Sequence, residues 1–562
     1  IASCLVGSEM CIRDRSKGAA HTSEPFAITL EVGSSLANET GSWRTERPVY
    51  VHNLPPCNKA CPAGENIQEW LYHAEEGDYE AAWREIMVNN PLPATMGRVC
   101  YHPCETACNR GQVDEAVGIN AIERFLGDKA IAEGWTVPLL QEETGKKVLI
   151  VGAGPSGLSA AYHLRRAGHT VTIRDAGPEA GGMMRFGIPA YRLPRGILRS
   201  EIERIENMGV TIELNTKVEN VDKEIENFDA IFLAVGAQIG KNVNIPAGSA
   251  ANMVDAVSVL RGVTDEDAED KPLLGRRVYV YGGGNTAVDV ARTARRLGAS
   301  ESVILYRRTR DQMPAHDSEV KEAEEEGVLM RWLSTVKHVD QGEIQIEKME
   351  LDENGFPQPT GEYETLQGDS LIMALGQDAD LSLVENDDEI EISNGVVQVN
   401  NQMMTGHRGI FAGGDMVPSE RTVTVAIGHG KKAARYIDAF LRDTEYHPAP
   451  KHADATFDRL STWYYADAPV QVREKLEGAR RASTFDEVVL GLDEGSALFE
   501  ARRCMSCGNC FGCDNCFGVC PDNAITKIKP GEYEFKYDYC KGCGICVEEC
   551  PCGAIDLVPE QS

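Results

Sequence analysis

The sequence predicts an α/β protein with two Rossmann-like dinucleotide-binding domains, and three observations carry this prediction. Two are glycine-rich turns, at residues 152–157 and 282–287, that each follow a β-branched strand and open a helical stretch. The third is a pair of cysteine runs, at residues 510–520 and 540–550. A strand, glycine turn and helix in succession is typical of doubly wound, mostly parallel sheets. We therefore expect such sheets between an N-terminal α-helical domain and a C-terminal, cysteine-rich α+β module.

Length and composition set the number and class of domains. At 562 residues the chain is too long for one core, so several domains are expected. The net charge of −31 argues against nucleic acid or an anionic membrane as partner. The sequence contains no apolar run of about twenty residues, so no membrane span is predicted. The 18 cysteines gather in three groups, which indicates metal ligation in a reducing cytoplasm rather than secreted disulfides.

Changes in composition mark the domain boundaries. Residues 1–22 read as a leader, because IASCLVGSEMCIRDRS resembles translated adapter sequence, and they are set aside with Cys4 and Cys11. The expected domains are a helical domain at 45–140, a first nucleotide-binding domain split between 146–245 and 365–445, a second at 250–364, a charged connector at 446–500 and the cysteine-rich module at 501–562.

The first glycine turn has the residues that a dinucleotide pyrophosphate requires. Gly152 makes the tight turn, Gly154 lets the backbone approach the phosphates, and Gly157 lets the helix pack on the strand. Asp175, at the end of the next strand, can accept a hydrogen bond from a ribose hydroxyl. A purely structural glycine turn is the weaker interpretation, because strand, helix and acid all stand in the required order.

The second glycine turn is followed by bases instead of an acid. The expected nucleotide contacts in the turn are Gly282, Gly284, Asn285, Thr286 and Ala287. The next strand ends at Arg307 and Arg308, and arginines in this place accommodate the 2′-phosphate of NADP. The alternative is that both arginines are solvated surface residues.

A third segment supports a flavin in the first nucleotide-binding domain. Residues 405–415 read as a strand that runs into a turn with Gly414 and Asp415, followed by a helical stretch. The acid can hold a ribityl hydroxyl, while the helix N-terminus favours negative charge on a reduced flavin. Two dinucleotide sites in series therefore indicate one FAD and one NAD(P)H, with NADPH preferred.

Both cysteine runs spell CxxCxxCxxxCP, the ligand pattern of a bacterial two-cluster ferredoxin. Three cysteines of each run hold one [4Fe–4S] cluster, and the fourth crosses to the other. The predicted ligand sets are Cys510, Cys513, Cys516 and Cys550 for one cluster, and Cys540, Cys543, Cys546 and Cys520 for the other. Zinc ribbons also use CxxC pairs, but they do not need two such runs ending in CP. For Cys504, Cys507 and Cys552 the sequence leaves open a shifted ligand register, a spare site, a small metal knot or plain thiols.

Several ordered motifs make residues 50–445 similar to the small subunit of bacterial glutamate synthase and its relatives. They are GRVC at 97–100, GGMMRFGIPAYRLP at 181–194, YGGGNTAVD at 281–289, YRR at 306–308, MPA at 313–315, MALGQ at 373–377 and GIFAGGD at 409–415. The resemblance implies a pyridine nucleotide-disulfide oxidoreductase-like fold, with FAD in the first domain and NAD(P)H in the second. It also implies iron–sulfur ligation by the helical domain, and it adds Gly182, Arg185 and Ala426 to the expected FAD contacts.

The N-terminal cysteines are fewer than the resemblance implies. Relatives usually supply ligands for two clusters, whereas here Pro55-Pro56 stands where an upstream CxxC pair is expected. The preferred set for one [4Fe–4S] cluster is Cys61, Cys100, Cys104 and Cys108, with Cys57 or Glu123 as alternative fourth ligands. No cysteine lies between Cys108 and Cys504, which excludes thiol–disulfide chemistry at the flavin.

These features together predict an NAD(P)H:ferredoxin-type oxidoreductase, or the equivalent subunit of a larger complex. Hydride transfer to a flavin needs orientation and a dry site, so no catalytic side chain is named. The expected partner is a ferredoxin, or the catalytic subunits of a complex such as a 2-oxoacid oxidoreductase. The direction of electron flow stays open. Three alternative functions also stay open. They are electron bifurcation, a role as the small subunit of glutamate synthase, and an electron-transfer subunit that is inactive until it docks on its partner.

Overall fold

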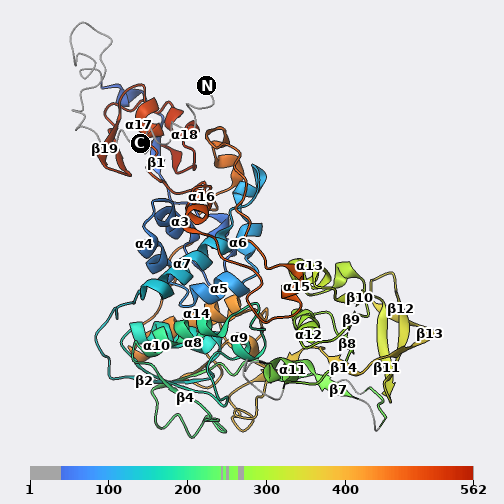
Figure 1. Cartoon of the computed structure of the whole chain (residues 1–562). Coiled ribbons are helices and arrows are strands. Elements are labelled where there is room, and N and C mark those ends of the chain that lie inside the picture. The colour runs from blue at the N-terminus through green and yellow to red at the C-terminus, as the bar shows by residue number, and fades with distance from the viewer. Residues whose placement is uncertain (1–38, 242–244, 249–251, 264–270, 561–562) are drawn as a thin grey trace.

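The computed structural model describes residues 39–241, 245–248, 252–263 and 271–560 (Figure 1). The first nucleotide-binding domain lies at the base of the view, with the second beside it. The helical domain sits on the first nucleotide-binding domain, and the C-terminal module lies beyond the helical domain. The predicted leader at 1–22, with Cys4 and Cys11, falls outside the described residues.

The helical domain is built from short helices. They are α2 (Pro56–Ala60), α3 (Ile67–Glu75), α4 (Tyr79–Ile86), α5 (Pro93–Val99), α6 (Pro103–Thr106), η3 (Asn109–Gln112) and α7 (Ile119–Glu133). Proline in the first turn of α2, α5 and α6 starts these helices where its missing N–H costs little. The buried Glu201 carboxylate accepts the N–H groups of Ala94 and Thr95, each at 2.8 Å. This cap fixes α5, whose C-terminal end carries Cys100.

The first nucleotide-binding domain has a parallel sheet in the order β18-β5-β2-β3-β4. Its strands are β2 (Lys147–Val151), β3 (Thr170–Arg174), β4 (Thr211–Glu213), β5 (Ala230–Leu233) and β18 (Ile410–Ala412). Its helices are α8 (Pro155–Arg166), α9 (Met183–Phe186), α10 (Arg195–Glu206) and α14 (Val423–Leu441), with the turn η5 (Gly414–Met416). Strands β2 and β5 are buried as apolar runs, as a sheet covered on both faces requires.

The second nucleotide-binding domain has a parallel sheet in the order β10-β9-β8-β14-β7. Its strands are β7 (Met253–Asp255), β8 (Arg277–Tyr281), β9 (Glu301–Leu305), β10 (Leu329–Arg331) and β14 (Ser370–Met373). Its helices are α11 (Ala256–Gly262), α12 (Asn285–Arg296), η4 (Arg310–Gln312) and α13 (Asp317–Glu325). Because β14 returns to this sheet, the domain extends past the predicted boundary at 364. The chain crosses between the two nucleotide-binding domains twice. Strands β6 (Ile239–Gly240) and β15 (Gln377–Asp378) lie on these two crossings and pair with each other.

An antiparallel sheet that the sequence analysis did not predict projects from the second domain (Figure 1). It contains β11 (Ser334–Asp340), β12 (Glu343–Leu351) and β13 (Pro357–Gln367). A further short hairpin, β16 (Ile392–Ser393) and β17 (Val396–Val397), lies in the second half of the first domain.

A strand from the other end of the chain completes the C-terminal module. The module contains α17 (Asn515–Val519), β19 (Ile525–Lys529), β20 (Glu532–Phe535), α18 (Ile545–Glu548) and β21 (Ile555–Pro559). Strand β1 (Glu46–Tyr50), which follows η2 (Thr40–Trp43), pairs antiparallel with β21. Residues 46–50 therefore belong with this module and not with the helical domain predicted from residue 45.

The predicted connector at 446–500 is packed against the other domains. Its regular elements are η6 (Phe457–Arg459), η7 (Thr462–Tyr464), α15 (Gly478–Arg481) and α16 (Glu494–Ala501). Helix α16 packs on α3 and α7, and Ala501 is buried in the core of the helical domain. That domain is itself fixed to the first nucleotide-binding domain, because Trp83 and Met87 share one apolar core with β2. In the described part of the chain, no helix is long and apolar enough to cross a membrane.

Candidate functional site

The first glycine turn forms a cradle at the N-terminus of α8. Gly152 has φ +110°, and a Cβ there would lie 2.3 Å from the Ala234 carbonyl oxygen. A Cβ on Gly154 would meet no atom within 4 Å, so this glycine borders open space. Within the described residues, the buried Ser156 Oγ makes no hydrogen bond. A dinucleotide pyrophosphate fits this cradle, since helix N–H groups and an unpaired hydroxyl supply the donors that it needs.

Three further predicted FAD residues lie around this cradle. Asp175 Oδ2 accepts a hydrogen bond from Ala153 N at 2.7 Å, which ties the end of β3 to the glycine turn. Gly182 packs against the turn, with its Cβ position 2.8 Å from Gly154 Cα. Arg185 is buried, and its Nε donates to a backbone carbonyl at 2.8 Å. Arg185 therefore holds its own loop in place beside the cradle.

The other border of the cradle comes from η5 and α14. A Cβ on Gly414 would lie 3.2 Å from Ser156 Cβ, so η5 approaches the first turn of α8 closely. Burial raises the pKa of the Asp415 carboxyl. Thr422 caps α14 by accepting a hydrogen bond from the backbone N–H three residues on, at 3.2 Å, and Ala426 is buried in the next turn. A helix N-terminus and an acid thus meet at the carboxyl edge of the sheet, where open α/β sheets bind ligands.

Helix α14 also contacts the cysteines of the helical domain. Thr424 Oγ1, in its first turn, donates to Cys100 Sγ at 3.2 Å. A Cβ on Gly428 would lie 2.2 Å from the Pro62 carbonyl oxygen, so α14 runs directly against the loop after Cys61. The flavin cradle and the N-terminal cysteines therefore share one helix. Sequence reasoning missed Thr424, because nothing local marks it as a neighbour of a residue so far away in the chain.

The second glycine turn repeats the geometry of the first. Gly282 has φ +149°, and a Cβ there would lie 2.1 Å from the Ala374 carbonyl oxygen. A Cβ on Gly284 would again meet nothing within 4 Å. Ala287, the third position, is fully buried where α12 packs on the sheet. The turn is therefore a second cradle of the same kind.

Side chains from neighbouring loops hold the second turn. Asn285 Oδ1 accepts a hydrogen bond from His316 N at 2.9 Å, and Thr286 Oγ1 lies 3.2 Å from Gln377 Nε2. The His316 ring stacks on Tyr101 with centroids 4.8 Å apart. His316, Gln377 and Tyr101 were not predicted as site residues. Tyr101 directly follows Cys100, so this stack connects the nucleotide turn with the helical domain.

The predicted NADP-reading arginines lie beside the second turn. Gly282 N donates to Leu305 O at 3.1 Å, which places the turn against the end of β9 just before the arginines. Arg307 is exposed. The Arg308 guanidinium lies 5.9 Å from the Phe356 ring centroid, and its Nε is buried without a hydrogen bond among the described residues. Both arginines thus follow directly on the strand end that the turn contacts, and their contact with a nucleotide stays a prediction.

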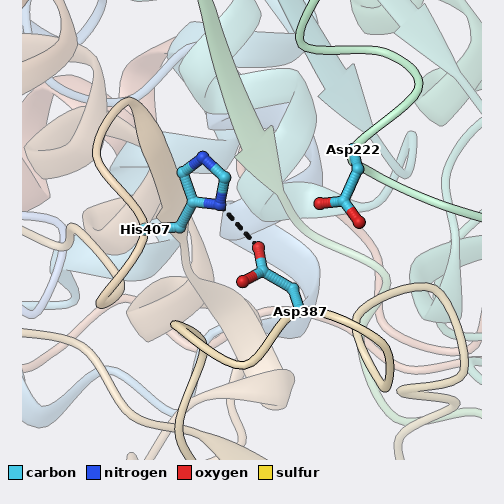
Figure 2. A group of neighbouring side chains, drawn as sticks. All are labelled: Asp222, Asp387 and His407. Atoms are coloured by element: carbon cyan, nitrogen blue, oxygen red, sulfur yellow. Dashed lines mark hydrogen bonds and ion pairs between the residues drawn. The ribbon is translucent and has the colours of Figure 1, made fainter.

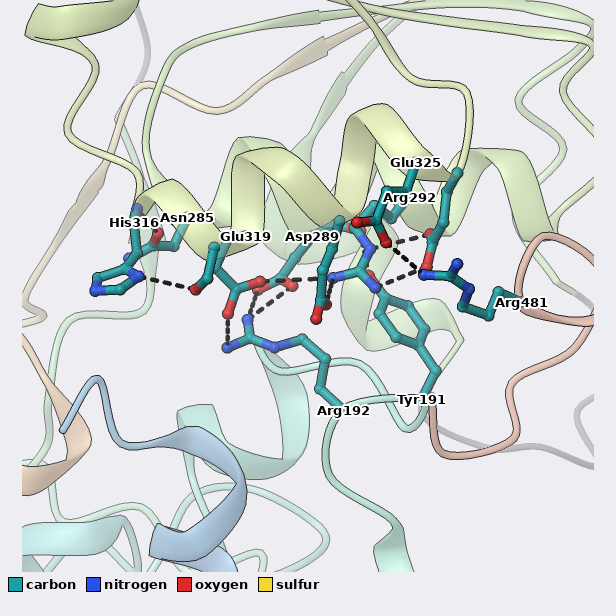
Figure 3. Close-up of polar contacts among 12 residues, drawn as sticks. Tyr191, Arg192, Asn285, Asp289, Arg292, His316, Glu319, Glu325 and Arg481 are labelled. Atoms are coloured by element: carbon teal, nitrogen blue, oxygen red, sulfur yellow. Dashed lines mark hydrogen bonds and ion pairs between the residues drawn. The ribbon is translucent and has the colours of Figure 1, made fainter. Parts of the chain in front are cut away.

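Figure 3 shows how α12 is fastened to the first domain. Arg192 Nη1 lies 2.8 Å from both carboxylate oxygens of Asp289, and Nη2 pairs with Glu319. The Tyr191 hydroxyl donates to the Asp289 carbonyl at 3.2 Å, and the Arg296 guanidinium lies 3.7 Å from the Tyr191 ring centroid. This buried network fixes the second glycine turn relative to the flavin cradle.

Two separate groups of cysteines lie in the helical domain. In the first, Cys61, Cys100 and Cys104 lie beside Glu123. Burial raises the pKa of the Cys100 thiol to about 12, and the Glu123 carboxylate adds to this shift. Glu123 Oε1 accepts a hydrogen bond from the buried Asn90 amide at 2.8 Å. The structure thus brings together three of the four predicted N-terminal ligands.

The fourth predicted N-terminal ligand, Cys108, is not in this group. Helix α6 ends at Thr106, so the helical repeat that would align Cys108 with Cys104 stops short of it. Cys108 instead has extended backbone before η3 and lines a different pocket with Cys57, Cys504 and Cys507. Glu123, the alternative in the prediction, takes its place beside the other three.

Both predicted ligand sets of the C-terminal module are brought together. Cys520, Cys540, Cys543 and Cys546 line one pocket. The other set is Cys510, Cys513, Cys516 and Cys550, where burial raises the pKa of the Cys513 thiol to about 12 and the other three thiols add to the shift. The two cysteines that precede proline, Cys520 and Cys550, have the same local geometry. Each accepts a hydrogen bond from the N–H of the residue four positions on, at 3.2 and 3.3 Å. Each lies with the run to which it does not belong. Ligation itself stays a prediction.

Cys552 is a neighbour of the second of these sets. Its Sγ lies 3.8 Å from Cys550 Sγ, and this hydrogen bond lowers the pKa of the Cys550 thiol to about 7. The shifted register that would use Cys504 and Cys507 in the C-terminal module does not occur, because both line the pocket of the helical domain.

A further group of potential ligands lies away from these sites. Asp222, Asp387 and His407 lie within 4.8 Å of one another in loops of the first nucleotide-binding domain (Figure 2). His407 Nδ1 lies 2.6 Å from one Asp387 oxygen, and the other oxygen accepts Glu389 N at 2.9 Å. One oxygen of Asp387 thus joins its loop to that of His407, and the other stabilises its own loop.

The fold and the two cradles define a flavin- and nucleotide-binding oxidoreductase with iron–sulfur modules, and comparison with known families gives the same class. Residues 146–430 match the family described as pyridine nucleotide-disulphide oxidoreductase. Residues 30–135 match the 4Fe-4S cluster domain II of dihydropyrimidine dehydrogenase, and residues 533–556 match a 4Fe-4S binding domain. The chain belongs to the pyridine nucleotide-disulphide oxidoreductase family. These matches confirm the predicted cofactors, which are FAD, a pyridine nucleotide and [4Fe–4S] clusters.

Individual relatives place it more narrowly. The chain is 38% identical over 541 residues to the NADP(+)-dependent formate dehydrogenase subunit beta of Moorella thermoacetica, covering 88% of this chain and 73% of that one. It is 34% identical over 527 residues to the NADPH-Fe(3+) oxidoreductase subunit beta of Geobacter sulfurreducens, covering 82% and 77%. With the glutamate synthase [NADPH] small chain of Escherichia coli it shares 33% identity over 411 residues, 68% and 87% of the two chains. The predicted membership among glutamate synthase small-chain-like enzymes is confirmed.

Proposed function

We propose that this chain is the NADPH-oxidising, electron-transfer subunit of a larger redox complex. The contact between Thr424 on the flavin-side helix and Cys100, at 3.2 Å, carries this proposal. It sets the first cysteine group against the flavin cradle, while the C-terminal module lies on the far side of the helical domain (Figure 1). Within the described residues, the cysteine groups thus extend from the flavin cradle in one direction, toward the C-terminal module.

Each part of the site has a role in this proposal. The turn of Gly152 and Gly154 and the N-terminus of α8 hold the FAD pyrophosphate, and Asp415 holds a ribityl hydroxyl. Bound FAD supplies the chemistry, which is to accept a hydride and release its two electrons singly. The protein contributes orientation, through the Arg192–Asp289 pair that fixes the two domains. Cys61, Cys100 and Cys104 with Glu123 hold the first cluster, and the twin sets of the C-terminal module hold two more.

NADPH is the preferred nucleotide in this proposal. Arg307 is exposed beside the second turn, and the neighbouring Arg308 has a buried Nε without a hydrogen bond among the described residues. A 2′-phosphate would supply an acceptor for Arg308 Nε and an opposite charge for Arg307. The names of the three relatives agree with this preference, since each contains NADP(+) or NADPH.

The partner in this proposal is a catalytic subunit that receives or donates the electrons. The relatives are named for formate oxidation, Fe(3+) reduction and glutamate synthesis, so the terminal reaction differs while the electron-transfer part is shared. A formate dehydrogenase-type partner has the support of the 38% identical relative, and the 2-oxoacid oxidoreductase named from the sequence has no further observation in its favour. The alternative of electron bifurcation rested on clusters on both sides of the flavin. The cysteine groups instead extend from the flavin in a single direction, which offers one electron route. The reduced cysteine groups fit a cytoplasmic location.

Rapid mixing with NADPH under anaerobic conditions tests the proposal. NADPH should bleach the flavin first and the iron–sulfur absorbance afterwards. In Cys100→Ala the flavin should still bleach while the C-terminal clusters stay oxidised, because the first step of the route is broken. Cys543→Ala, at the far end, is the matched control and should leave cluster reduction beside the flavin intact. Cluster bleaching at the native rate in Cys100→Ala contradicts the route, and an unbleached flavin in the native chain contradicts the function.

A further inference from the structure

A pocket in the helical domain is lined by four cysteines that the sequence analysis did not group together, because it placed Cys108 in another set and left Cys504 and Cys507 unassigned. Cys57 comes from α2, Cys108 precedes η3, and Cys504 and Cys507 follow α16. The pocket encloses about 350 Å³ of space between atoms, solvent-open space included, and the pocket of the predicted ferredoxin-type set around Cys540 encloses about 330 Å³ on the same measure. We propose that these four cysteines ligate a further [4Fe–4S] cluster, the shared cluster, which both ends of the chain hold together.

The turn at Cys504 has the local geometry of the C-terminal cluster runs. Ser506 has φ +49° and donates its N–H to Cys504 Sγ at 3.4 Å. Gly512 and Gly542 stand at the same offset after the first cysteine of each run, with φ +78° and +71°, and their N–H groups bond those thiols. A left-handed backbone is unfavourable for a residue with a side chain, and it persists chiefly at functional sites. The buried Ser506 therefore marks Cys504 as the first ligand of a metal-binding turn.

The four thiols are enclosed close to one another. Burial raises the pKa of Cys57 and of Cys504 well above the usual range, and neighbouring cysteines of the same pocket add to both shifts. Burial also raises the pKa of Cys507 to about 11. Four half-buried thiols gathered at one pocket gain little from one another, whereas a bound metal takes them as thiolates and fills the pocket.

Buried ion pairs hold the segment of Cys504 and Cys507 in the helical domain. Arg503 is 2% exposed, and its guanidinium binds Glu500 at 2.6 Å and Asp114 at 3.2 Å. The pairing of β1 with β21 joins the two ends of the chain nearby. The two distant cysteines thus supply what the sequence lacks at Pro55-Pro56, where an upstream CxxC pair was expected.

The shared pocket lies between the flavin-side cysteines and the C-terminal module. Cys61 N donates to Cys57 O at 3.2 Å, which joins the two groups of the helical domain. Cys507 and Cys510 are three positions apart, so their Cα atoms are at most about 11 Å apart. The half-buried Tyr465 donates its hydroxyl hydrogen bond to Met505 O at 3.0 Å, and its pKa is raised by burial and then by thiols of both regions.

This position gives the shared cluster a relay role, which rests on the proposed function. A cluster held by these four cysteines would accept one electron at a time from the flavin side and give one electron to the C-terminal module. Two such passes would carry the two electrons of each hydride, no atom would be transferred, and the charge of the cluster would be restored after each pass.

Iron content of the full chain, purified anaerobically, tests the ligation. Cys504→Ser/Cys507→Ser should lose about four iron and four sulfide per chain, with the flavin retained as a measure of the fold. The dithionite-reduced protein should lose one [4Fe–4S] signal in its electron paramagnetic resonance spectrum. Cys57→Ser/Cys108→Ser should lose the same four, and the quadruple variant should lose no more, because all four ligands serve one cluster. Cys4→Ser/Cys11→Ser is the matched control and should lose none.

Unchanged iron in both pairs overturns the inference, as does loss of one zinc ion in place of iron. Additive losses in the quadruple variant overturn it too, since the pairs would then serve different clusters. If a double variant loses its flavin, Cys507→Ser alone replaces it: a changed resonance signal supports the shared cluster, and an unchanged spectrum overturns it. Failure of the proposed function would appear separately, as a native chain whose flavin NADPH does not reduce.

Discussion

The C-terminal module and the helical domain hold their cysteines in opposite ways. In the module, both ligand sets come from two compact runs, and the structure brings them together as the sequence predicts. In the helical domain, one pocket combines Cys57 and Cys108 with Cys504 and Cys507, from the other end of the chain. A compact run specifies its own site through short loops. A site recruited across the chain depends on packing elsewhere, here on α16 and on the buried ion pairs of Arg503.

The largest expected effect, a loss of iron, comes from two truncations that compare the C-terminal module with the shared pocket. Ending the chain after residue 508 should remove about eight iron atoms, because it deletes only the two clusters of the module. Ending it after residue 500 should remove about twelve, because Cys504 and Cys507 are lost as well. Iron analysis of both proteins, normalised to flavin, measures the difference. Equal losses would mean that residues 501–508 hold no iron.

A substitution in the flavin cradle separates the flavin from both cysteine regions. Gly154→Val should lower bound FAD about tenfold or more, because a side chain would fill the space where the pyrophosphate approaches. Its iron content should stay close to native, since the clusters belong to other domains. Flavin absorbance and iron are read on the same sample. Full flavin absorbance in this variant would refute the placement of FAD.

The NADPH preference is a smaller effect at the entry to the route. Replacing Arg307 and Arg308 by alanine should lower kcat/KM for NADPH about ten- to hundredfold, through loss of charge-assisted hydrogen bonds worth about 1.5–3 kcal/mol. The value for NADH should change little, because NADH has no 2′-phosphate. Dye-linked assays with both nucleotides provide the measurement, and equal losses would show that the arginines do not read the phosphate.

The smallest effect is expected at the left-handed serine of the shared pocket. Ser506→Gly should keep its iron and change the free energy of unfolding by no more than about 1 kcal/mol, because glycine adopts this backbone readily. Ser506→Val is the matched control, and its β-branched side chain should lower iron occupancy. Denaturant unfolding and iron analysis compare the two. A glycine variant that lost iron would disconnect the turn from the cluster.

Local patterns predicted the parts of the site that are local in sequence. Both glycine turns are cradles, since Gly154 and Gly284 each border open space, and the turns need only their own strand and helix to form. The twin cysteine runs are equally self-contained. The alternating residues of β12 carried a strand signal as well, but the antiparallel sheet was missed among the parallel units around it.

Long-range packing decided what the sequence did not predict. Cys108 was named first among three candidates for the fourth ligand, but α6 ends between Cys104 and Cys108, and Glu123 lies beside Cys104 instead. Strand β14 joins the second sheet past the predicted boundary, because its partners are β7 and β8. The pocket of Cys504 and Cys507 was not predicted because its other two cysteines, Cys57 and Cys108, lie hundreds of positions away in the chain. No local signal identifies such neighbours.

The ratio of iron to flavin in the native chain tests the central claim most directly. Four [4Fe–4S] clusters in a line, one beside the flavin, one shared and two in the C-terminal module, amount to about sixteen iron atoms per FAD. The protein should be purified and analysed without oxygen, with zinc measured on the same sample. A ratio near sixteen without stoichiometric zinc is the predicted result. A ratio near twelve, or one zinc ion per chain in addition, would contradict it.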